Sequence, residues 1–295
     1  MESKYIKQHI VPKSYLQRFA DKGDSAYRIG VWQKNNKHYI ASIDNVGYLK
    51  NYYDVEHLED KKKWEHFFSE NIEAPCDKPI SHIISRTMLS SITATILYDY
   101  DKLIMSRYII TQLYRVPAFI DYHIGNSKKI VDTYKADILK RVCFLPTEYQ
   151  ETIRNINFTD DQYKDNILLH LESNLDRYCK VLTQKVWVVY VNQTSLPFIT
   201  SDDPVVMTNI QSKSTSRNDN GIGNESTLIF FPLNSHIAIG IYPKSFSWIN
   251  GLDGKIAILK SNDTKWVCHM NLDIMNQCYN QTFLPIDLYN NIFTK

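Results

Sequence analysis

The fold class of this chain of 295 residues follows from one stretch, WVVYVNQTSLPFITSDDPVVM, at residues 187–207. Before this stretch, from about residue 55 to 185, apolar residues recur at the spacing of amphipathic helices. From Trp187 onward, short runs rich in β-branched and aromatic residues alternate with turns, which is typical of strands. A run of helices followed by a run of strands predicts an α+β fold rather than a doubly wound sheet.

The predicted elements form one interwoven domain that spans residues 1–295, because no linker-like segment divides the chain. In chain order we expect a β-hairpin at about 27–44, five or six helices at about 55–185, a mostly antiparallel β-rich part at about 186–268 and a final helix at about 269–281. The longest helix is expected at about 100–123, and the hairpin is expected to join the C-terminal sheet. The polar, Gly-containing segment 211–226 is predicted to be a mobile loop and a candidate lid.

Composition excludes several classes of protein. The formal net charge is +2, from 34 basic and 32 acidic residues, so overall charge gives no argument for nucleic-acid binding. The five cysteines are scattered without a CxxC pair, which favours reduced thiols over a disulfide framework or a zinc site. No run approaches the roughly 18 apolar residues of a membrane span, and the N-terminus has no apolar signal-peptide region. These features predict a cytoplasmic protein without membrane contact.

Near the N-terminus, His9 and Lys13 flank a Val-Pro pair in KQHIVPKSYLQRF. Pro12 suits the first turn of a short helix and would fix the backbone between the two side chains. An imidazole can act as a base, and an ammonium can bind a phosphate oxygen. The alternative is that His9 bonds a carbonyl group while Lys13 is solvated.

A second candidate group lies on the expected helix that carries RYIITQLYRVP. Arg107, Thr111 and Arg115 are spaced by four residues and share a face, while Gln112 stands one turn before Arg115. A buried guanidinium and a buried amide need hydrogen-bond partners, from the protein or from a ligand. Either a substrate phosphate or carboxylate or a structural glutamate would serve, and the sequence leaves both open.

The segment PFITSDDPVVM delivers Ser201, Asp202 and Asp203 at the end of an apolar run. Carboxylates at the end of a strand can bind a metal or act as a base. The same residues also form good turn chemistry, because Asp can cap its own backbone and Pro204 fits a turn. In the acidic stretch KWEHFFSENIEAP, Glu65 and Glu73 stand eight residues apart, and Glu73 is the carboxylate that we expect to turn inward.

Taken in order, these segments resemble a bacterial family known as domain of unknown function 4238. The N-terminal signature His-x-Val-Pro-Lys-x-Tyr-Leu-x-x-Phe matches residues 9–19, Gln-x-x-Arg-x-Pro matches 112–117, and Pro-Phe-(Ile/Val)-Thr-Ser-Asp-x-Pro matches 197–204. The similarity runs from about residue 7 to 281. Asp202 matches the late motif more firmly than Asp203, where the family pattern has Asn more often. The resemblance implies that His9, Lys13, Gln112, Arg115 and Asp202 converge on one pocket.

The leading hypothesis is a phosphodiester hydrolase, either a nuclease or a nucleotide-cleaving effector in phage defence or a toxin system. His9, Lys13 and Asp202 would be catalytic, Gln112 and Arg115 would bind the substrate, and Glu73 with Asp202 would hold Mg²⁺ or Mn²⁺. Expected partners are nucleic acid or a nucleotide and a protein from the same operon. The alternative is a non-catalytic module that senses a small anion or nucleotide. A third reading is a polar cluster that only fixes the fold.

Overall fold

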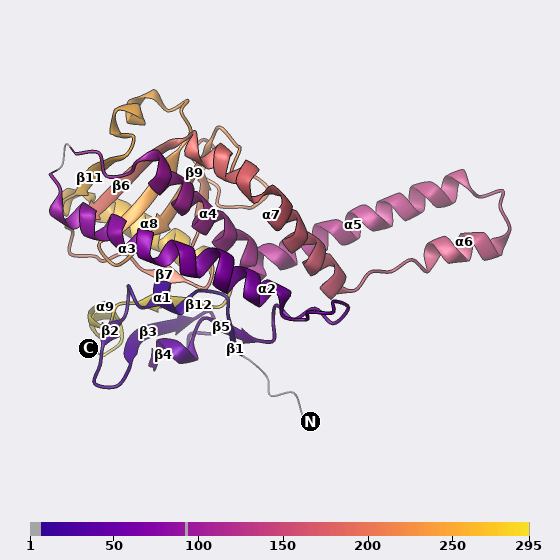
Figure 1. Cartoon of the computed structure of the whole chain (residues 1–295), viewed down its shortest axis with the longest axis horizontal. Helices are drawn as coiled ribbons and strands as arrows, with labels where there is room; N and C mark the ends of the chain where they lie inside the picture. The colour runs from indigo at the N-terminus through magenta and orange to yellow at the C-terminus, as the bar shows by residue number, and fades with distance from the viewer. Residues whose placement is uncertain (1–6, 92–93, 295) are drawn as a thin grey trace.

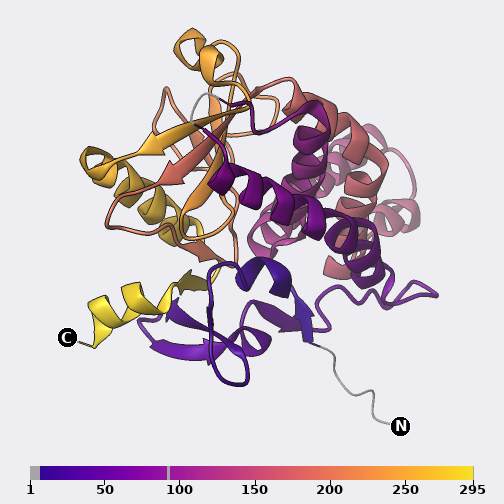
Figure 2. The same cartoon turned by 60° about the vertical axis from the view of Figure 1, so that its left-hand side comes forward.

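The computed structural model describes residues 7–91 and 94–294, so the first six positions of the expected N-terminal region lie outside the described residues. The strands are β1 (Lys7–His9), β2 (Asp21–Lys22), β3 (Tyr27–Gln33), β4 (His38–Ser42), β5 (Tyr48–Lys50), β6 (Val186–Asn192), β7 (Thr200–Ser201), β8 (Val206–Asn209), β9 (Thr227–Pro232), β10 (Ile237–Tyr242), β11 (Lys255–Leu259) and β12 (Gln281–Leu284). The α-helices are α1 (Lys13–Leu16), α2 (Lys63–His66), α3 (Ala74–Leu89), α4 (Asp99–Arg115), α5 (Pro117–Arg141), α6 (Thr147–Arg154), α7 (Asp160–Thr183), α8 (Thr264–Gln277) and α9 (Ile286–Phe293). Helices α2 to α7 gather on one side of a larger sheet, α8 covers its other face, and a smaller sheet lies beneath them (Figures 1 and 2).

The larger sheet has the strand order β11-β6-β10-β9-β8, and its pairs are antiparallel except for β11 with β6. Successive residues of β6 point to opposite faces. Trp187 and Val189 enter the core shared with the helices, whereas Val188 and Tyr190 enter a second core against α8. Because both faces are covered, the strand is apolar without interruption, and each buried Val contributes about 1.5–3 kcal/mol. The predicted α+β class is confirmed.

The predicted hairpin is confirmed, since β3 and β4 pair antiparallel in register from Arg28↔Ser42 to Trp32↔His38. On its other edge β3 pairs with β12, which in turn pairs with β7. The hairpin therefore joins C-terminal strands, although in a sheet separate from the larger one. Strand β1 lies outside this sheet and pairs antiparallel with β5.

Six α-helices, α2 to α7, occupy the described part of the predicted helical region, with a π-helical segment η2 (Phe67–Glu73) between α2 and α3. The predicted helix at 100–123 is wrong, because α4 ends at Arg115 and α5 begins at Pro117. A residue before proline is driven out of the α-region. Val116 accordingly has φ −78° and ψ 143°, and the chain turns there.

The helix predicted at 269–281 is present as α8, which runs earlier, over Thr264–Gln277. The sequence analysis did not predict β12 or α9, which follow it. A strand of four residues is too short to show alternation, so it leaves little signal in a sequence. Among the described residues, no helix combines the length and the apolar character that a membrane crossing requires.

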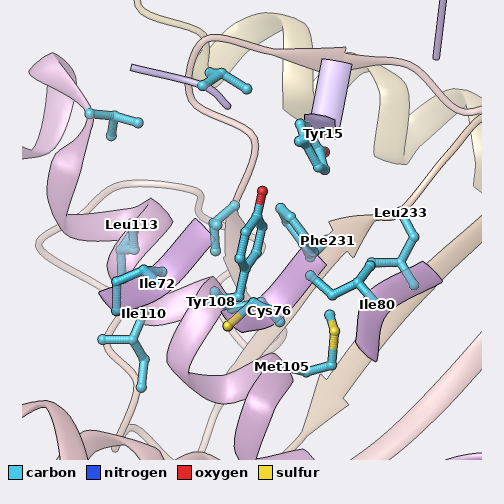
Figure 3. Packing of buried hydrophobic residues seen from close by; sticks show 14 of the residues in the cluster. Tyr15, Ile72, Cys76, Ile80, Met105, Tyr108, Ile110, Leu113, Phe231 and Leu233 are labelled. Carbon is cyan, nitrogen blue, oxygen red and sulfur yellow. The ribbon is translucent and has the colours of Figure 1, made fainter. Parts of the chain in front are cut away.

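The short helix α1 is fixed to the core by Tyr15 (Figure 3). Its ring stacks on Phe231 of β9 at 5.2 Å between centroids, and its hydroxyl lies 2.8 Å from both Thr200 Oγ1 and the Pro232 carbonyl oxygen. Tyr15 thus joins α1 to both sheets. This contact places the residues on either side of α1, including His9, at the junction of the helices and the sheets.

Candidate functional site

Arg115 lies at the last position of α4 and is only 2% exposed. Its guanidinium donates to Glu73 Oε1 at 2.6 Å, to the His9 carbonyl oxygen, and to the Tyr53 hydroxyl at 3.2 Å. The Phe68 ring lies 4.5 Å below the guanidinium carbon, within the range of a cation–π contact. We call the following residues the Arg115 cluster, because each contacts this guanidinium or interacts electrostatically with it or with His9: His9, Lys13, Tyr53, Glu65 and Glu73.

Gln112 acts one turn earlier on the same helix. Its side-chain amide donates to the Ile10 carbonyl oxygen at 2.8 Å. Arg115 and Gln112 together hold two consecutive carbonyl groups of the N-terminal segment. The structure therefore brings Gln112, Arg115 and the His9 segment together as the sequence analysis expected, through backbone oxygens rather than through the imidazole.

The His9 imidazole is uncharged at neutral pH. Burial, followed by the charges of Lys13 and Arg115, lowers its pKa from 6.5 to about 4, against the opposing effects of a backbone hydrogen bond with Ile43 and the charge of Asp44. Its Nε2 atom is buried and has no hydrogen-bond partner among residues 7–91 and 94–294. Lys13 forms a 2.8 Å ion pair with Asp44 in which both side chains are about half exposed. Lys13 therefore lies at the solvent edge of the cluster.

Glu65 is a member of this cluster that the sequence analysis passed over in favour of Glu73. Its Oε2 atom is buried and finds no hydrogen-bond partner within the described ranges, 7–91 and 94–294. Burial raises the pKa of Glu65, Arg115 opposes the rise, and the charges of Glu73 and Asp54 add to it. The sequence does contain a signal for Glu65, because it stands between the aromatic residues Trp64 and Phe67. A carboxylate in such a position cannot be solvated on all sides.

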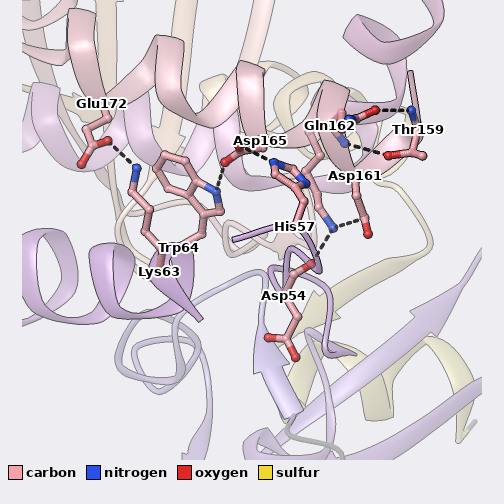
Figure 4. Close-up of polar contacts among 10 residues, drawn as sticks. Asp54, His57, Lys63, Trp64, Thr159, Asp161, Gln162, Asp165 and Glu172 are labelled. Atoms are coloured by element: carbon pink, nitrogen blue, oxygen red, sulfur yellow. Dashed lines mark hydrogen bonds and ion pairs between the residues drawn. The ribbon is translucent and has the colours of Figure 1, made fainter. Parts of the chain in front are cut away.

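The two residues before Glu65 on α2, Lys63 and Trp64, hold this helix against α7 (Figure 4). The Trp64 indole donates to Asp165 Oδ1 at 2.9 Å, and Lys63 bonds Glu172 at 3.0 Å, so both residues tie α2 to α7. His57 lies 3.1 Å from the other oxygen of Asp165. Because Trp64 is fully buried, α2 has little freedom to rotate, and Glu65 is held toward the Arg115 cluster.

Asp202 has a different environment from the one predicted. Its carboxylate accepts three backbone N–H groups at 2.8 Å, those of Tyr279, Asn280 and Gln281. Burial raises its pKa to about 7, while these three hydrogen bonds oppose the rise. Asp202 therefore caps the turn that leads into β12. Ser201, rather than Asp202, caps the local turn, since its hydroxyl accepts the N–H of Asp203 at 3.1 Å.

Three tyrosines interact in succession, beginning at the Arg115 cluster: Tyr53, Tyr52 and Tyr279. Tyr53, which bonds Arg115, packs edge-on against Tyr52 with 5.1 Å between ring centroids. Burial raises the pKa of Tyr52, and the nearby Asp121 and Tyr279 raise it further. The backbone of Tyr279 in turn bonds Asp202. The hydrogen bonds of the Asp202 side chain involve none of the other predicted residues, so its convergence with them stays a prediction.

Asp203 is fully buried and ion-paired to Arg217, which extends from the loop at 211–226. Burial raises the pKa of Asp203 to about 6, and Arg217 opposes that rise. The loop is also tied to α5 by a hydrogen bond between Tyr122 and Asn218. It is anchored by polar contacts, whereas its predicted mobility remains a prediction.

The donors assigned to a metal do not fit one. Glu73 Oε1 is occupied by Arg115, and both oxygens of Asp202 are taken up by backbone N–H groups. Within residues 7–91 and 94–294, no group of three or more His, Cys, Asp or Glu side chains is arranged to hold an ion. A Mg²⁺ site needs several free oxygen ligands in near-octahedral geometry.

Two adjoining cavities lie away from the predicted residues, between α4, α5, α7 and the 211–226 loop. Their volumes are about 280 and 230 Å³, and they share Tyr114, Phe119 and His123 as walls. Burial, the charge of Arg217 and the neighbouring His170 lower the pKa of His123. None of the residues predicted from the sequence lines either cavity.

Comparison with known proteins gives one match. No curated protein and no solved structure is significantly similar to the chain. A family model described as protein of unknown function (DUF4238) matches residues 7–284, which is nearly the whole chain and includes all of the Arg115 cluster. The chain therefore belongs to this family.

Proposed function

We propose that the Arg115 cluster is the reaction site of a hydrolase that cleaves phosphodiesters by acid–base catalysis. The observation that carries this proposal is a pair of buried polar atoms, His9 Nε2 and Glu65 Oε2, that find no hydrogen-bond partner in the described part of the chain and that both interact electrostatically with Arg115. Their environments push the two pKa values in opposite directions, down for the imidazole and up for the carboxyl. Such a divergence is what acid–base pairs in enzymes have in common.

In this reaction the neutral His9 imidazole accepts a proton from water as the water attacks phosphorus. Glu65, in its protonated form, donates its proton to the leaving oxygen as the P–O bond breaks. The products are a phosphomonoester and an alcohol. Lys13 at the open edge and the buried Arg115 stabilise the negative charge on the phosphorane.

Binding of the substrate would itself change the pKa of His9, the proposed base. A bound phosphodiester anion favours the protonated imidazole and therefore raises the pKa of His9 from its low value toward neutrality. A base is most effective when its pKa lies near the working pH. The low pKa of the free protein is thus compatible with catalysis in the complex.

The proposal contains no metal, because Glu73 and Asp202 are engaged with protein groups. We place both in supporting roles: Glu73 orients Arg115, and Asp202 holds the turn before β12. The remaining parts of the hypothesis belong to the same proposal, namely a cytoplasmic location, a role in phage defence or as a toxin, and a partner protein from the same operon.

The test is cleavage of a panel of single- and double-stranded DNA, RNA, and linear and cyclic dinucleotides, each with Mg²⁺, Mn²⁺ or EDTA. We expect cleavage that persists in EDTA and falls at least about a hundredfold in His9→Gln and in Glu65→Gln, the low end for losing an acid or base. The matched controls are His82→Gln and Glu70→Gln, because both side chains are exposed on neighbouring helical turns. Unchanged cleavage in either cluster variant contradicts the assignment.

The alternative function is a module that binds a small anion or nucleotide without cleaving it. Binding without turnover, with His9→Gln and Arg115→Lys both weakening the affinity, would establish this alternative. Cleavage that appears only with Mg²⁺ or Mn²⁺ and is lost in EDTA would instead return a metal to the mechanism.

A further inference from the structure

A helical hairpin formed by α5 and α6 stands out from the rest of the molecule (Figure 1). We call residues 126–159 the arm. Near the body, Phe119, Ile120 and Ile124 of α5 are buried, but from residue 125 to residue 163, all of which the structure describes, no side chain is buried. The arm therefore has no core of its own.

The arm nevertheless carries an apolar stripe. Ile130, Tyr134 and Ile138 are spaced by four residues and share one face of α5. The residues one position further along the helix are turned about 100° away from this stripe. One of these residues is Lys135, which bonds Asn157 on the segment that follows α6 and so faces that returning segment. The apolar stripe is left facing outward.

Seven large apolar side chains of the arm are between 43% and 79% exposed: Ile130, Tyr134, Ile138, Phe144, Tyr149, Ile156 and Phe158. At about 200 Å² for each side chain, they expose roughly 800 Å² in total. This area is close to the roughly 800 Å² that each partner contributes to a standard protein interface.

We infer that the arm is a dimerisation element that packs against the arm of a second copy of this chain. The charges favour a self-complementary contact. Between residues 128 and 141, α5 has five basic and two acidic residues, whereas the returning segment from 147 to 161 has four acidic and one basic. A two-fold contact places α5 of each copy beside α6 of the other, so that opposite charges meet and the apolar stripes are covered.

The same attraction already acts within one copy, where Lys128 pairs with Asp160 at 2.5 Å. Two α5 helices packed directly on each other would instead place like charges together, which disfavours that arrangement. The contact of α5 with the partner's α6 is therefore the arrangement to which the proposal commits.

The test is the molar mass of the full-length protein, measured by light scattering after size exclusion. At about 100 µM, a contact with a Kd of about 1 µM is nearly saturated, and we expect twice the chain mass of 34.6 kDa. Tyr134→Glu combined with Ile138→Glu should give the monomer mass with an unchanged melting temperature, since both side chains are exposed. Trp248→Glu, which alters an equally exposed residue outside the arm, should remain dimeric.

A charge-swap series distinguishes a second copy from another partner. Glu148→Lys with Glu151→Lys should weaken the dimer by at least about tenfold, and adding Lys140→Glu with Arg141→Glu should restore it. A monomer mass for the wild type at this concentration overturns the inference. A dimer that survives the two substitutions in the stripe overturns it as well, because the contact then lies elsewhere.

Discussion

Replacing Arg115 by Met tests whether the buried guanidinium holds the N-terminal segment in place. The substitution removes the donors to Glu73, to the His9 carbonyl and to Tyr53 while keeping a linear side chain of similar length. Removing one partner of a buried ion pair costs about 3–5 kcal/mol, because the other partner stays buried without compensation. We therefore expect the free energy of unfolding to fall by this amount.

At about 2 °C for each kcal/mol in a chain of this size, the melting temperature should drop by roughly 6–10 °C. Hydrogen exchange should rise first in β1, whose carbonyl group loses its donor. The matched control is Arg107→Met on the same helix, where the ion pair with Asp176 is exposed. Such pairs contribute about 1 kcal/mol or less. Equal melting temperatures for the two variants would refute the reasoning.

Three further predictions concern the surroundings of the site. Burial raises the pKa of Asp202 to about 7. The stability that this group contributes is therefore complete below its ordinary pKa near 4 and is lost as the pH rises through about 7. Asp202→Asn should remove this part of the pH dependence of the free energy of unfolding, measured in urea titrations. Tyr15→Phe should destabilise the protein by about 1–2 kcal/mol through the loss of its buried hydrogen bonds, whereas exposed Tyr100→Phe should leave the urea midpoint unchanged. Arg217→Ala should accelerate hydrogen exchange in the 211–226 loop, since it removes the ion pair that anchors the loop; unchanged exchange there would contradict this role.

Much of the fold could be predicted because its signals are local. The uninterrupted apolar run of β6 and the alternation of the 27–44 hairpin both appear in the structure where the sequence placed them. The break at Val116 was missed because the apolar period continues through Pro117, although the backbone does not. Strand β12 was missed because its pairing with β3 and β7 is a long-range property that four residues do not reveal.

The candidate site was predictable only in part. The motifs singled out Arg115 and Gln112, which the structure places on the N-terminal segment, but their partners there are the backbone carbonyl groups of His9 and Ile10, and a backbone acceptor has no signature in a sequence. Asp202 caps a turn 77 to 79 positions away, so local turn chemistry gave no indication of its role. Glu65 has a buried oxygen that finds no partner among the described residues, and it interacts electrostatically with Arg115. Neither property can be seen in the sequence.

The most direct test of the central claim is the titration of His9 by NMR in protein labelled with ¹³C at histidine, with His9→Gln to assign the signal. We predict that His9 titrates near pH 4 in the free protein and that a saturating phosphodiester dinucleotide moves its pKa toward neutrality. The exposed His82 should not respond. A His9 that titrates near 6.5, or one that no phosphodiester perturbs, would contradict a neutral base in an anion-binding site.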